Sequence, residues 1–167
     1  GDPAPAGRFG AYRCWVTPAT LDKWNTRLKL SNDPLDATFV YGNYRVIYNA
    51  GVLYAGSPYH SRLYNGPLGT APCDYKLVFP NDDPFLGNNE ATVCWPGLAQ
   101  SDGIDNTGQQ EQTSYWIAGQ LGLPFNYRRY ASFFLNGTQR SFIMEDVQKP
   151  DGDILNQWYS NEPDGDL

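Results

Sequence analysis

The sequence has no run of about 18 apolar residues, the length that a membrane-spanning helix needs, so we expect no membrane span. It is also poor in positive charge, with 12 Lys and Arg against 18 Asp and Glu and a formal net charge of −6. Binding along a phosphate backbone needs clustered basic side chains, and the only adjacent basic pair here is Arg128-Arg129. Because basic residues are few and scattered, we do not expect nucleic acid to be a partner.

Histidine and cysteine are scarce as well. His60 is the only histidine and no nucleophile motif stands near it, which disfavours hydrolases that use a Ser-His or Cys-His pair. One histidine and three scattered cysteines also disfavour a zinc site. Cys73 and Cys94 flank a loop-rich segment, where they either form a disulfide or stay reduced and buried, and the sequence leaves both alternatives open. Acidic clusters such as residues 151–153 lack EF-hand spacing, so we expect no metal ligands.

Tyrosine, glycine and proline are abundant instead. The 167 residues include 12 Tyr, 17 Gly and 13 Pro, while charged residues make up only 18%. This length fits one domain, and the glycine and proline content predicts many turns and long loops. The aromatic-rich, lysine-poor composition favours an extracellular or cell-surface location. The chain starts at Gly1 rather than at a methionine, which indicates processing or cleavage.

The N-terminal region is expected to contain a linker followed by a packing helix. Residues 1–10 are interpreted as a flexible lead. Thr17-Pro18 is typical of a helix start, with Thr as the N-cap and Pro in the first turn. Leu21, Trp24 and Leu28 would then share one face of that helix and pack against the rest of the domain.

The middle of the chain is expected to alternate strands with long loops. Residues 37–55 are predicted to form two or three strands, with turns at Gly42-Asn43 and near residues 49–51. Residues 75–79 are predicted to be a short strand. Residues 80–110 are rich in Asn, Asp and Gly and are predicted to be mostly loop.

The clearest interior helix is predicted at residues 109–121. Its apolar stripe is expected to be Ser114, Ile117, Ala118 and Leu121. Gly122 would end the helix. Glu111 falls on the same stripe, and a carboxylate on the packing side of a helix usually has a partner.

A hairpin and a short helix are predicted near the C-terminus. Arg129–Leu135 and Ser141–Val147 would be the strands, joined at Asn136-Gly137, which is a strong hairpin signal because both residues tolerate positive φ. Asp151 or Asp153 would cap the helix that follows. Together these elements predict an α+β fold, with a small antiparallel sheet, one long helix and a hairpin.

Four short motifs occur in an order that resembles the CotH kinase-like (spore-coat CotH) family. They are Ala55-Gly56-Ser57, Asp74 to Phe79, Gly122-Leu123-Pro124, and Leu135-Asn136-Gly137 followed by Glu145. The resemblance covers roughly Asp36 to Tyr159 and concerns the N-terminal part of the family only. It implies the small lobe of an atypical protein-kinase-like fold. The expected division is therefore residues 1–35 as linker and packing helix, and residues 36–167 as the CotH-like domain.

The resemblance implies ATP-dependent phosphorylation of Ser or Thr in a protein substrate, with Mg²⁺. By that template Lys76 would contact the phosphates and pair with Glu111, although Glu111 comes from helical spacing and analogy. Met144 and Glu145 would begin the hinge, the segment whose backbone contacts the adenine. The Gly56-Ser57 turn would offer backbone N–H groups to the phosphates.

The chain also departs from the family pattern. Ala55 and Gln110 stand where the family has arginines, and Ser141 stands where it has a glycine. The catalytic and metal-binding aspartates of kinase-like proteins belong to a second lobe, which is missing here. We therefore expect no catalytic residue in this chain and an inactive fragment.

The alternative function is a non-catalytic structural or binding module in an extracellular or cell-surface assembly. Its aromatic-rich loops, residues 54–64 and 95–116, would form the contact surface, and it would associate with a partner or with itself. Carbohydrate binding is a third hypothesis, and it rests only on exposed Trp and Tyr.

Overall fold

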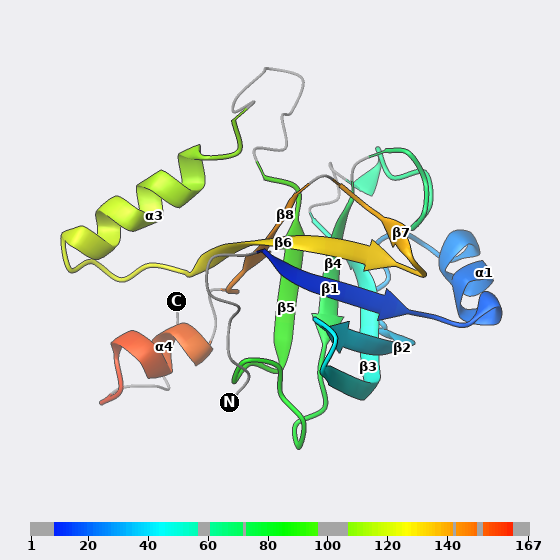
Figure 1. The fold of residues 1–167 in the computed structure, drawn as a ribbon, viewed down its shortest axis with the longest axis horizontal. Coiled ribbons are helices and arrows are strands. Elements are labelled where there is room, and N and C mark those ends of the chain that lie inside the picture. Colours follow the sequence, from blue (N-terminus) through cyan, green and yellow to red (C-terminus); the bar gives the residue numbers. More distant parts are fainter. Residues whose placement is uncertain are drawn as a thin grey trace.

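The computed structural model describes residues 9–56, 61–71, 73–96, 107–141, 143–149 and 152–161. Its strands are β1 (Gly10–Trp15), β2 (Leu35–Tyr41), β3 (Arg45–Ala55), β4 (Asp74–Val78), β5 (Glu90–Cys94), β6 (Arg128–Leu135), β7 (Thr138–Gln139) and β8 (Met144–Val147). Its helices are α1 (Pro18–Thr26), α3 (Gln110–Gln120) and α4 (Gly152–Trp158), and they lie at the sides of the sheet (Figure 1). No helix in this described part of the chain has the length and hydropathy to cross a membrane.

Seven strands form a closed mixed barrel. The order β1-β2-β3-β4-β5-β8-β6 is antiparallel throughout, and a parallel pairing between β6 and β1 closes it. Gly10 lies opposite Ala131 at one end of this closing pair, and Cys14 lies opposite Leu135 at the other. β7 pairs with β6 beside the barrel. Closure leaves β1 and β6 with a neighbour on both sides, which protects them from pairing with other chains.

The predicted small antiparallel sheet with one long helix is therefore wrong. No strand was predicted at residues 10–15, and residues 80–110 were predicted to be mostly loop, yet β1 and β5 are strands that complete the ring. β1 lies within residues 1–35, which were expected to be a linker and a packing helix. Its partner β6 is far away in the sequence, near the other end of the chain. The interior helix has 11 residues and projects from the barrel instead of packing on a sheet (Figure 1).

Aromatic rings fill the inside of the barrel. Phe39 is fully buried, and its ring meets those of Phe85 at 4.9 Å, Phe79 at 5.2 Å and Tyr12 at 5.6 Å between centroids. All three contacts are edge-on, the geometry that aromatic quadrupoles favour. The barrel interior is thus a packed hydrophobic core.

Several local predictions are confirmed. Thr17 caps α1 by accepting a hydrogen bond from the Thr20 N–H at 3.1 Å, and Trp24 is the buried residue of that helix. Asn136 and Gly137 take positive φ of 47° and 79° in the predicted turn. α4 also forms, although Asp151 lies outside the described residues.

Two other local predictions are wrong. The turn expected near residues 49–51 is absent, because β3 runs unbroken through them and absorbs Asn49, at a φ of 56°, in a shift of its register with β2. The return strand of the hairpin begins at Met144 rather than Ser141, since the short β7 comes first.

Candidate binding surface around helix α3

The predicted nucleotide residues on β4 and α3 do not pair with each other. Lys76 lies on β4, and its Nζ is 2.7 Å from Glu90 Oε1. Glu111 lies in the first turn of α3 and forms an ion pair with Arg128. The lysine–glutamate pair that the kinase template requires is therefore replaced by two separate pairs.

The predicted hinge residues lie in the middle of the sheet. Met144 is fully buried inside the barrel, and Glu145 is 1% exposed. β8 is paired with β5 on one side and β6 on the other, so it has no free edge to offer an adenine ring. Gly56 follows β3 with a φ of 103°, whereas Ser57 lies outside the described residues. Nucleotide binding by these residues stays a prediction.

Arg128 is the centre of a polar cluster that the sequence did not reveal. Its Nη1 lies 2.7 Å from Glu145 Oε2 and also pairs with Glu111, so one guanidinium holds two of the predicted site residues. Gln112 donates from Nε2 to Glu145 Oε1 at 3.1 Å. The Arg128 guanidinium lies 5.2 Å from the centre of the Tyr115 ring. These contacts join α3 to β6 and β8.

A second ion pair lies one residue further along, on the other face of the same two strands. Asp146 is fully buried and accepts at Oδ2 from Arg129 Nε at 2.9 Å and from the Tyr12 hydroxyl at 2.6 Å. Arg128 thus pairs with Glu145 on one face of the sheet, and Arg129 pairs with Asp146 on the other face. The sequence contained a signal for these contacts, because two adjacent arginines lie on one predicted hairpin strand and two adjacent carboxylates lie on the other.

Burial governs the ionisation of both carboxyls. It raises the pKa of Glu145, against the opposing effect of Arg128. It also raises the pKa of Asp146, where Arg129 and the Tyr12 hydroxyl oppose it. The same desolvation raises the pKa of the Tyr12 hydroxyl, so this group remains a hydrogen-bond donor.

The apolar stripe predicted for the interior helix does not face the barrel. α3 has no buried residue, and Ile117 and Leu121 are 46% and 68% exposed. The inner side contacts Arg128 through Glu111, Gln112 and the Tyr115 ring. We call Ser114, Ile117 and Leu121 the outer face of α3, since residues three and four apart share a side of a helix.

The cysteines are free thiols in the structure, so the reduced alternative holds for Cys73 and Cys94. Burial raises the pKa of Cys14 to about 12 and raises that of Cys94 as well. Cys73 lies 2.8 Å from the Tyr75 hydroxyl. Because the thiolate is the reactive form, none of the three is suited to be a nucleophile near neutral pH. Among the described residues, no group of three or more His, Cys, Asp or Glu is placed to hold a metal ion.

No protein-family model matches the chain, and no curated protein is found to be similar to it. The resemblance to the CotH kinase-like family therefore rests on the four quoted motifs alone.

Proposed function

We propose that this chain is a non-catalytic binding module of an extracellular or cell-surface assembly, and that it associates with a second copy of itself through the outer face of α3. One observation carries the proposal: α3 is tied to the barrel through Glu111 and Gln112, while Ile117 and Leu121 are exposed to solvent. The aromatic-rich, lysine-poor composition supports the location.

A partner that covers the exposed side of α3 would stabilise the helix. A helix of 11 residues is only marginally stable by itself in water, and most helices gain their stability from packing an apolar face. Gln109 provides no side-chain cap at the start of α3. At its end the Leu123 N–H bonds the Ala118 carbonyl at 2.9 Å, which holds the 52% exposed Leu123 beside the helix terminus. Burial of each such aliphatic side chain contributes about 1.5–3 kcal/mol.

Charge does not oppose the pairing of two copies at the outer face of α3. The chain carries a net charge of −6, so most faces of two copies repel each other. Glu111 is the one charged residue of α3, and Arg128 engages it on the inner side. Two outer faces can therefore meet without bringing like charges together, and depletion of charge is typical of interface cores.

The double variant Ile117→Gln, Leu121→Gln is expected to abolish self-association without unfolding the barrel, because both side chains are exposed. Sedimentation velocity from low micromolar to several hundred micromolar protein measures this. Leu30→Gln with Leu63→Gln is the matched control, since these leucines are 55% and 59% exposed elsewhere. A wild-type chain that stays monomeric over the whole range contradicts the proposal.

A second candidate is the phosphorylation that the CotH resemblance implies, in a protein that also contains the metal-binding aspartates. The buried Glu145, shared through Arg128 with Glu111, favours it, because buried carboxyls with a raised pKa are common at functional sites. Calorimetric titration with Mg-ATP tests it. Binding that is lost in Lys76→Ala and kept in Lys23→Ala, a lysine on α1, supports this candidate. Absence of binding at millimolar Mg-ATP, or equal binding by both variants, contradicts nucleotide binding by the predicted residues of this chain.

A further inference from the structure

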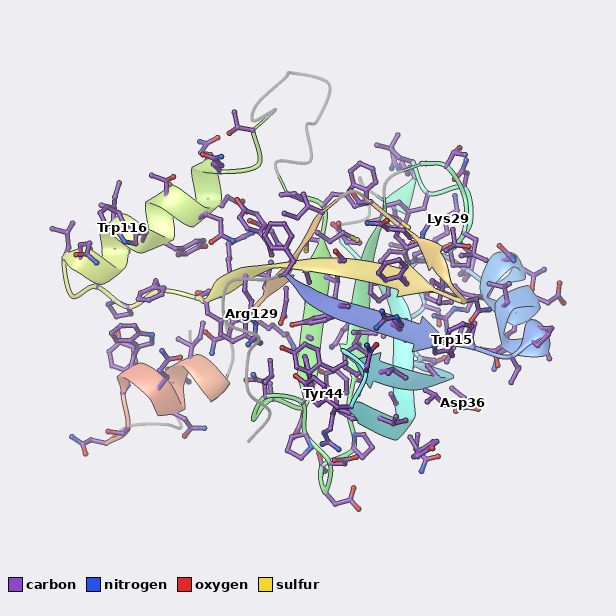
Figure 2. The ribbon with its side chains drawn as sticks, viewed as in Figure 1. Trp15, Lys29, Asp36, Tyr44, Trp116 and Arg129 are labelled. Atoms are coloured by element: carbon purple, nitrogen blue, oxygen red, sulfur yellow. The ribbon has the colours of Figure 1, made fainter. Side chains whose placement is uncertain are left out.

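Two pockets lie on either side of Tyr127, where the chain enters β6. The first, which we call the aromatic pocket, has a volume of about 410 Å³ and lies between α3 and the start of β6. The second, which we call the amide pocket, has a volume of about 460 Å³ and lies toward α4. Figure 2 shows Trp116 on α3 and Arg129 near the base of β6, which line the first and the second pocket respectively. Both volumes are within the range of about 300–1,000 Å³ that small-molecule sites occupy.

The aromatic pocket offers the exposed ring of Trp116 together with amides. Its lining includes Tyr115, Trp116, Phe125 and Tyr127, with Gln112 and Gln120 at its sides. Trp116 is 64% exposed, so most of its indole is accessible to a ligand. Flat apolar rings next to amide donors and acceptors match the C–H face and the hydroxyl rim of a sugar ring.

Gly119 shapes this pocket. A Cβ at this position would come within 3.1 Å of the Phe125 ring, so the glycine lets α3 approach that ring closely. Phe125 also packs against Trp158, whose ring centre lies 5.3 Å away. The Trp158 indole N–H bonds the Phe125 carbonyl at 3.1 Å. The ring is therefore held in place from both helices, which lowers the entropic cost of binding a ligand.

The amide pocket is polar and internally organised. Its lining includes Asn88, Gln148, Asn156 and Gln157. Gln148 is 5% exposed, accepts from the Tyr127 N–H at 3.1 Å and donates to Gln157 at 3.4 Å. Asn88 donates to the Tyr127 hydroxyl at 3.2 Å. These bonds fix the orientation of several amides around one shared tyrosine.

The charges around both pockets select against anionic ligands. Arg128 is engaged by Glu111 and Glu145, and Arg129 by Asp146. Neither arginine is left to neutralise a phosphate or a carboxylate, and the net charge of −6 repels anions further. We infer that the two pockets together bind a neutral oligosaccharide that lies across Tyr127, with one sugar ring against Trp116 and hydroxyls on the amides near α4. This site uses the inner side of α3 and goes beyond the proposed self-association through the outer face.

The test is saturation-transfer NMR and calorimetry with three neutral probes, cellotetraose, maltotetraose and the tetramer of N-acetylglucosamine. We expect saturable binding of at least one probe. Trp116→Ala should weaken it about five- to tenfold, the amount that loss of ring stacking represents. Gln157→Ala should weaken it as well, because that side chain lines the other pocket. The variant Ile117→Gln, Leu121→Gln should bind the sugar as the wild type does, which separates this site from self-association.

Trp15→Ala is the matched control, since Trp15 is a 47% exposed tryptophan on β1, far from both pockets (Figure 2). Equal weakening by Trp15→Ala and Trp116→Ala would overturn the proposal, as would a folded protein that binds none of the three probes. Binding of aryl glycosides through the aryl group alone would also overturn it, because it would identify a pocket for an apolar side chain.

Discussion

Arg129→Met is expected to lower the free energy of unfolding by about 3–5 kcal/mol. Asp146 is fully buried, and its Oδ2 receives both Nε and Nη2 of Arg129, at 2.9 and 2.8 Å. Removing the guanidinium leaves a buried carboxyl that still accepts a hydrogen bond from the Tyr12 hydroxyl but has lost its positive partner. Urea unfolding followed by tryptophan fluorescence measures the change.

Arg13→Met provides the control for the loss of an arginine. The Arg13 guanidinium bonds the Gly42 carbonyl at 2.6 Å and lies over the Phe134 ring, but it compensates no buried carboxylate. Its loss should cost about 1 kcal/mol. The double variant Arg129→Met, Asp146→Leu should recover much of the stability, because an apolar pair leaves no buried charge. If Arg13→Met and Arg129→Met lowered the free energy of unfolding equally, the ion pair with Asp146 would contribute no more to stability than an ordinary arginine contact.

The loss in Arg129→Met should depend on pH in a defined direction. Burial raises the pKa of Asp146 in the folded state, and removing Arg129 raises that pKa further. A group with a raised folded pKa contributes stability that is complete below its unfolded pKa of about 3.9 and is lost as pH rises through the folded value. The variant should therefore be closest to the wild type near pH 4 and furthest from it near neutral pH.

Phe39→Ala is the second substitution with a large expected effect, a loss of about 3–5 kcal/mol. Phe39 lies on β2 and contacts three other rings inside the barrel. The alanine leaves a cavity that the closed ring of strands cannot collapse to fill. Since small domains have only about 5–15 kcal/mol of stability, the variant should melt at a much lower temperature in calorimetry.

Phe39→Leu separates volume from ring geometry. It keeps most of the apolar volume and should cost less than about 1.5 kcal/mol. Tyr44→Ala, at a 60% exposed ring, should change stability little. If Phe39→Ala behaved like Tyr44→Ala, the interior of the barrel would not be the packed core described above.

The sequence predicted the elements that are encoded locally. The Asn136-Gly137 turn and the Thr17 cap depend on residues within a few positions of each other, so their chemistry is legible in the chain. The closing pair of the barrel has no such signal. β1 and β6 are parallel and far apart in sequence, and no turn joins them. β5 has only five residues between loop-forming segments, which concealed it.

The helix at the candidate surface could be predicted from the sequence, but the side of it that faces the barrel could not. Periodicity identified α3 as a helix, and Gly122 ends it with a φ of 69°. Periodicity could not determine which side of the helix meets the barrel. Arg128 decides that, and its partners come from both α3 and β8. Glu145 was predicted as a hinge residue, and that role stays a prediction, whereas its contacts with Arg128 and Gln112 required the three-dimensional arrangement.

The way the barrel closes also has a consequence for biosynthesis. A hydrogen bond joins the Val16 N–H to the Asn136 side chain, 120 residues later in the chain. Ribosomes add about 5–20 residues per second, so the segment that becomes β1 leaves the tunnel several seconds before its parallel neighbour exists. During that interval its inward aromatic, Tyr12, has no β6 to cover it. The β1 segment therefore stays without its parallel neighbour until β6 has been synthesised, and the barrel cannot close before that point.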